Sequence, residues 1–104
     1  MTVTEFVHHP ERDTLVLLDV RDSEERRKGR FVEGSLHVPL PEILAGEDFG
    51  VDYQTPIVVL CERGARAQVV AQYLSACGFV SVSRLEGGYR ELAPYVVENE
   101  LPVT

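Results

Sequence analysis

One stretch of the sequence, PIVVLCERGARAQVVAQYL at residues 56–74, constrains the fold more than any other. Its first five residues are apolar throughout, which is typical of a strand buried on both faces of a sheet. From Ala67 onward, apolar residues recur with the spacing of one helix face. A cysteine, two arginines and a glycine lie between these two patterns. The stretch therefore predicts a strand and a helix joined by a short loop that begins at Cys61.

The rest of the chain repeats this alternation of strand and helix patterns. Further strands are expected at residues 14–20, 35–40 and 80–85, and further helices at residues 23–28, 39–46 and 86–96. No element is assigned to the polar segment before residue 14. Strands that alternate with helices are typical of an α/β domain with a mostly parallel sheet.

Composition limits the class of protein and its partners. A length of 104 residues fits one domain, residues 1–104. A net charge of −7 argues against nucleic acid and anionic membranes as partners. No apolar run approaches the roughly 20 residues that span a bilayer, and the amino-terminal residues lack a secretion-signal pattern. Two cysteines without a metal-ligand motif fit free thiols. We therefore expect a cytoplasmic protein.

The loop after the second apolar strand carries the groups suited to chemistry. Ligands of parallel sheets bind beyond the carboxyl ends of the strands, where Cys61 lies. Backbone N–H groups of the loop and the helix start near Arg66 would form a concavity that binds anions. Arg63 and Arg66 would add positive charge, and Gly64 would permit the tight turn. Such surroundings favour the nucleophilic thiolate form of a cysteine.

Five segments of the chain occur together in a recognisable order: LLDVRDSEE, EGSLHVPL, PIVVLCERGARA, YLSACGF and LEGGYREL. In this ordered set the chain resembles the single-domain rhodaneses, a family of sulfurtransferases, from Leu15 to Leu92. The resemblance implies a rhodanese-like three-layer α/β domain, with a central, mainly parallel five-stranded sheet flanked by helices.

The resemblance also implies roles for individual residues. Cys61 would be the nucleophile that accepts sulfur, and Asp19 and Arg21 would give structural support. The substrate cradle would consist of Glu62, Arg63, Gly64, Ala65 and Arg66. The implied activity is that of a thiosulfate sulfurtransferase: Cys61 takes a sulfur atom from a small anionic donor such as thiosulfate and passes the persulfide sulfur to cyanide or a thiol. A protein sulfur acceptor is a further candidate partner, and no cofactor or metal is needed.

Three features depart from the family pattern. The segment GRFVEGS, residues 29–35, stands where the family often has Gly-His-Ile-Pro-Gly. Ala67 replaces a common serine or threonine, and Leu92 replaces a common tryptophan. None of these changes affects the thiol or its loop, so we expect them to alter substrate preference rather than the class of reaction.

Two alternative functions remain open. The first is a non-enzymatic module that carries sulfur or binds a partner. The second is a cysteine-loop phosphatase or arsenate reductase, in which five residues separate the cysteine from an arginine. Here Arg66 comes one residue early, which gives a tighter loop better suited to one sulfur atom than to a phosphoryl group.

Two more residues carry expectations about their position. Cys77 follows the helical spacing of the apolar face, so we expect it in the core and too far from Cys61 to form a disulfide. Glu62 would weaken anion binding if it faced the site, so we expect it to point away.

Overall fold

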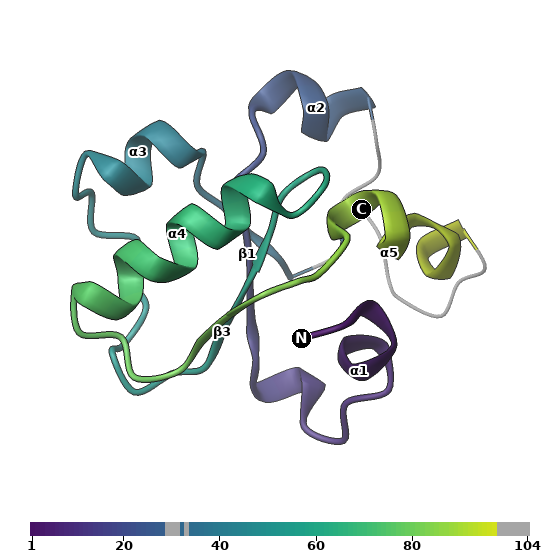
Figure 1. Ribbon diagram of the computed structural model, residues 1–104, viewed down its shortest axis with the longest axis horizontal. Coiled ribbons are helices and arrows are strands. Elements are labelled where there is room, and N and C mark those ends of the chain that lie inside the picture. Colours follow the sequence, from purple (N-terminus) through teal and green to yellow (C-terminus); the bar gives the residue numbers. More distant parts are fainter. Residues whose placement is uncertain (29–31, 33, 98–104) are drawn as a thin grey trace.

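The computed structural model describes residues 1–28, 32 and 34–97 (Figure 1). In chain order the elements are α1 (Val3–Val7), the short 3-10 helix η1 (Arg12–Thr14), β1 (Val16–Asp19), α2 (Ser23–Lys28), β2 (Leu36–His37), α3 (Leu40–Leu44), β3 (Ile57–Leu60), α4 (Ala65–Ala76), β4 (Val82–Arg84) and α5 (Gly88–Val97). The predicted alternation of strands and helices is confirmed, although β2 and β4 are shorter than expected.

The strands form one parallel sheet with the order β2-β1-β3-β4. β1 and β3 lie side by side at its centre, with Leu18 opposite Val59 and Asp19 opposite Leu60. Because both central strands run in the same direction, Asp19 and the residue after Leu60 reach the same edge of the sheet. That edge carries the candidate site.

The expectation of a five-stranded sheet is wrong, because the described residues form four strands. Met1 occupies the position beside β4 where a fifth strand would pair. Its amino group donates to the carbonyl of Arg84 at 3.0 Å, and its own carbonyl accepts from the N–H of Glu86 at 2.8 Å. A helix starts two residues later, so this pairing is too short to be a strand.

Helix α1 was not expected from the sequence. It is held by a capping box, in which the Thr2 hydroxyl accepts from the N–H of Glu5 and the Glu5 carboxylate accepts from the N–H of Thr2, each at 3.1 Å. Such reciprocal bonds satisfy two of the orphan N–H groups at a helix start. The Thr-x-x-Glu pattern is the sequence signal that could have predicted the start of this helix. The helix has only five residues, which makes it hard to recognise from the sequence.

Each face of the sheet packs against its own helices, as Figure 1 shows for α3 and α4 on one side and α1 and α5 on the other. Side chains along the strands alternate between the two cores. Leu17, Val58 and Leu60 belong to the core under α1 and α5, whereas Leu18 and Val59 belong to the core under α3 and α4. Burial on both faces explains why the central strands are continuously apolar.

Helix α4 begins directly after the loop that follows β3. Its buried residues Ala67, Val70 and Leu74 pack on the sheet with the spacing predicted from the sequence.

Among the described residues, no helix has both the length and the apolar composition needed to cross a membrane.

Candidate functional site

Cys61 comes directly after β3 and turns toward the face of the sheet that α4 covers. Its sulfur accepts hydrogen bonds from the backbone N–H of Gly64 at 3.0 Å and of Ala67 at 3.3 Å. Gly64 precedes α4 with φ at +103°, in the left-handed region that favours glycine. The loop therefore curls around the sulfur and directs two N–H donors at it.

Cys61 also lines a hollow of about 320 Å³. Its lining residues are Glu25, Cys61, Glu62, Arg63, Ala65 and Arg66. Although only 1% of Cys61 is exposed, the residue forms part of the wall of this hollow. The structure thus brings four of the five predicted cradle residues together around the cysteine. Gly64, the fifth, is buried and contributes its N–H and its turn.

Arg66 forms a two-pronged ion pair across this hollow with Glu25 of α2. Its two terminal nitrogens lie 2.5 and 2.6 Å from the two carboxylate oxygens. These bonds lower the pKa of Glu25 to about 2 and raise the pKa of Arg66 above its usual value. Glu25 was not predicted as a site residue from the sequence. The pair spans 41 residues of sequence, so no local spacing reveals it.

The other two charged residues of the loop differ in burial. Arg63 is exposed at the rim of the hollow. Glu62 is half-buried and is also among the residues that line the hollow. Its carboxylate lies 3.7 Å from a guanidinium nitrogen of the buried Arg21, which does not line the hollow. The expectation that the Glu62 side chain points away from the site stays a prediction.

Asp19 and Arg21 form a fully buried ion pair behind the loop. Arg21 donates from Nε to one carboxylate oxygen at 3.0 Å and from Nη2 to the other at 2.8 Å. The guanidinium also lies 4.2 Å from the ring centre of Tyr89. Burial opposes the charge of Arg21, yet the carboxylates of Asp19 and Glu62 raise its pKa overall. Neither Asp19 nor Arg21 lines the hollow, which fits structural support.

The start of α5 holds the loop from the opposite side. The N–H of Tyr89 donates to the carbonyl of Cys61 at 2.8 Å, and the N–H of Arg90 donates to the carbonyl of Glu62 at 3.1 Å. A Cβ atom on Gly88 would lie only 2.5 Å from the Cys61 carbonyl oxygen. The absence of a side chain at Gly88 thus allows the backbone of α5 to contact the loop directly.

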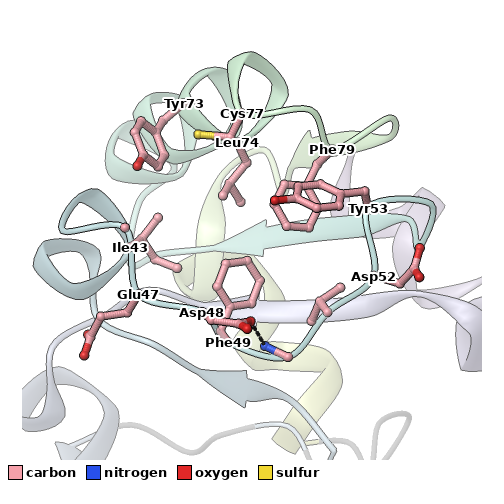
Figure 2. Close-up of a pocket in the computed structure, with 13 residues that line it drawn as sticks. Ile43, Glu47, Asp48, Phe49, Asp52, Tyr53, Tyr73, Leu74, Cys77 and Phe79 are labelled. Atoms are coloured by element: carbon pink, nitrogen blue, oxygen red, sulfur yellow. Dashed lines mark hydrogen bonds between the residues drawn. The ribbon is translucent and has the colours of Figure 1, made fainter.

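A second, larger hollow of about 640 Å³ lies at the other end of α4, beside the loop that follows α3 (Figure 2). Its lining includes the stacked rings of Phe49 and Phe79, and also Tyr73 and Cys77. A hydrogen bond with Cys77 raises the pKa of Tyr73. Cys77 is exposed and free, so the expectation that it fills the core is wrong. It caps α4 and lies a helix length away from Cys61.

Two of the three departures from the family pattern can be placed in the structure. Ala67 is fully buried and supplies one of the N–H donors to the sulfur through its backbone, which needs no hydroxyl. Leu92 is fully buried in the core under α5. Most of the GRFVEGS segment lies outside the described residues, so the expectation for its turn stays a prediction.

A parallel α/β sheet with a cysteine loop at its carboxyl edge defines a class of small domains, and comparison with known proteins gives the family. Residues 2–93 match the model of the rhodanese-like domain. The chain belongs to this family, as its sequence predicted.

Two relatives show where the chain stands within the family. It is 32% identical over 89 residues to the thiosulfate sulfurtransferase GlpE of Shewanella oneidensis, covering 86% of each chain. It is 34% identical over 91 residues to GlpE of Stutzerimonas stutzeri, covering 82% of this chain and 79% of that one. These names support the sulfurtransferase family.

A solved structure supports the fold. The human single-domain sulfurtransferase TSTD1 superimposes with a TM-score of 0.73 at 22% sequence identity. The match covers 88% of this chain and 91% of the human chain. At this identity the likeness concerns the fold, and the rhodanese-like architecture expected from the sequence is confirmed apart from the number of strands.

Proposed function

We propose that this protein is a thiosulfate sulfurtransferase that carries a persulfide on Cys61. In the first step the Cys61 thiolate attacks the outer sulfur of thiosulfate, a new S–S bond forms, and the old S–S bond breaks to release sulfite. In the second step cyanide attacks the terminal sulfur of the persulfide, giving thiocyanate and the free thiolate. A thiol acceptor, small or on a protein, would take the same sulfur as its own persulfide. Each step transfers one sulfur atom.

One observation carries this proposal: the sulfur of Cys61 receives two backbone N–H bonds, and Cys61 lines a hollow of about 320 Å³. Such fixed donors stabilise negative charge on sulfur before and after attack without reorganising. Arg63 at the rim is suited to attract an anionic donor. The two relatives named thiosulfate sulfurtransferase support the same choice of reaction.

The phosphatase alternative is less well supported by the geometry. A phosphoryl group would need the guanidinium of Arg66, but both of its terminal nitrogens already bind Glu25. The carrier alternative differs only in the second step, since a carrier would accept sulfur without discharging it to a small acceptor.

We further propose a cytoplasmic location, because both cysteines are free and a reducing compartment preserves free thiols.

The test combines mass measurement with product analysis. Wild type, Cys61→Ser and Cys77→Ser proteins are incubated with thiosulfate, and the intact mass of each is determined before and after addition of cyanide. We expect wild type and Cys77→Ser to gain one sulfur atom and to lose it as thiocyanate, whereas Cys61→Ser does neither.

Each contrary outcome has its own meaning. A sulfur adduct that persists in cyanide and in thiols would favour the carrier. Full transfer by Cys61→Ser would refute the proposal, and hydrolysis of a phosphate ester that depends on Cys61 would favour the phosphatase.

A further inference from the structure

Glu25 lines the hollow and binds Arg66, yet the proposed reaction assigns its carboxylate no role. We propose that Glu25 is a specificity-determining residue that sets the charge of the preferred sulfur donor, favouring monoanions over the dianion thiosulfate. This inference rests on the proposed function and concerns the donor class of the same site.

The charges that line the hollow are largely paired. Both carboxylate oxygens of Glu25 bind the guanidinium of Arg66, so this pair presents no net charge to a ligand. Glu62 adds a further carboxylate, which faces Arg21 at 3.7 Å. Among the described lining residues, Arg63 is then the cation that forms no ion pair with a described carboxylate, and it lies exposed at the rim of the hollow.

Glu25 is also held in place from its own helix. Its backbone N–H donates to the Asp22 carboxylate at 2.8 Å, and its own carboxylate accepts from the N–H of Asp22 at 3.2 Å. This reciprocal cap fixes the start of α2. Because Glu25 is anchored at both ends, an incoming anion would have to compete with a pre-formed pair for Arg66.

The negative charge that enters the site in the first step differs between sulfur donors. Thiosulfate brings two negative charges to a site that already holds the Cys61 thiolate, and it leaves as sulfite with two. Methanethiosulfonate brings one, and its S–S bond breaks to leave methanesulfinate with one. Both donors load the same persulfide by the same bond exchange, so they differ mainly in charge at the hollow.

The experiment measures the ratio of kcat/KM for thiosulfate to kcat/KM for methanethiosulfonate, with cyanide as acceptor. We expect Glu25→Gln to raise this ratio about three- to tenfold, because removing one charge at contact distance in a partly screened site has an effect of this order. Glu25→Asp, which keeps the charge, should leave the ratio within about twofold of wild type.

Glu24→Gln is the matched control. Glu24 lies on the same helix, is exposed and pairs with Lys28 at 3.3 Å, and its replacement changes the net charge equally without altering the hollow. Its ratio should stay within about twofold of wild type. If Glu25→Gln does not fold, Arg66→Gln gives the reciprocal test: it leaves Glu25 unbalanced and should lower the ratio.

The outcomes separate this inference from the proposed function. An unchanged ratio in Glu25→Gln, or equal shifts in the Gln and Asp variants, would overturn the specificity role while sulfur transfer stands. Failure of both donors to load Cys61 in wild type would overturn the proposed function and this inference with it.

Discussion

The backbone N–H of Tyr89 donates a 2.8 Å hydrogen bond to the carbonyl oxygen of Cys61. This bond ties the first turn of α5 to the loop that carries the sulfur. A second bond, from Arg90 to Glu62, fixes the next residue of the loop in the same way. The position of the sulfur therefore depends on a helix that contributes no side chain to the lining of the hollow.

Replacement of Gly88 by alanine should displace this loop. The new Cβ would lie 2.5 Å from the Cys61 carbonyl oxygen and 2.7 Å from that of Glu62, at a φ of +65°. We expect a loss of about 2–4 kcal/mol in the free energy of unfolding and a fall in persulfide formation of at least tenfold. Urea unfolding and intact-mass measurement provide the two readouts.

Gly46→Ala is the control for backbone strain alone. Gly46 has a φ of +82°, but nothing lies within 4 Å of the position of its Cβ. Its replacement by alanine should lower the free energy of unfolding by about 1 kcal/mol and leave persulfide formation unchanged. Equal losses in the two variants would show that close contact between α5 and the loop is unimportant.

Asp19→Asn should strongly destabilise the fold. Asp19 and Arg21 are both fully buried, so the substitution leaves a guanidinium without its main counter-charge. Breaking such a pair costs about 3–5 kcal/mol. Urea unfolding measures the loss, and Glu24→Gln, which breaks an exposed pair, should cost less than about 1 kcal/mol. A mild effect at Asp19 would mean that water reaches Arg21 readily.

The pair of Glu25 with Arg66 should give a stability term that depends on pH. The folded-state pKa of Glu25 is lowered to about 2, chiefly by the hydrogen bonds from Arg66. A lowered pKa means that the contribution is fully present above the unfolded value of 4.5 and is lost as the pH falls toward 2.

The comparison with Glu25→Gln measures this term. Both side chains of the pair are partly exposed. The free energy of unfolding of wild type should therefore exceed that of the variant by only about 0.2–1 kcal/mol at pH 6. The difference should shrink between pH 4.5 and pH 2 in urea unfolding series. A difference that stays constant over this range would exclude ionisation of Glu25 as its source.

Arg63→Gln should raise the KM for thiosulfate about three- to tenfold with little change in stability, because Arg63 lines the hollow but is exposed. Arg27→Gln removes the same charge from an exposed position of α2 that does not line the hollow. Steady-state kinetics gives the KM for thiosulfate of both variants. The comparison separates the effect of charge at the hollow from the effect of the net charge of the chain. If both raise the KM equally, the net charge of the chain governs donor binding.

The sequence predicted the central part of the fold because its signals there are local. The apolar run before Cys61 reflects a strand that is buried on both faces. The helical spacing after Ala67 reflects a helix that is buried on one face. The position of Cys61 at the carboxyl edge follows from the direction of a parallel strand. These features need no knowledge of distant contacts.

The missed features all depend on contacts between distant segments or on chain ends. Glu25 meets Arg66 only when α2 folds toward α4. The ion pair of Glu62 with Arg21 likewise joins segments far apart in the sequence. Cys77 keeps the apolar spacing of α4 but falls at its C-cap, where the residue is exposed.

The contrast between the two cysteines has a practical consequence for chemical labelling. Cys77 is exposed beside the larger hollow, whereas Cys61 is covered by its loop. A bulky maleimide should therefore modify Cys77 first, which allows a fluorophore to be attached a helix length from the sulfur-carrying residue. A probe placed there could report on unfolding without touching the reactive end of the sheet.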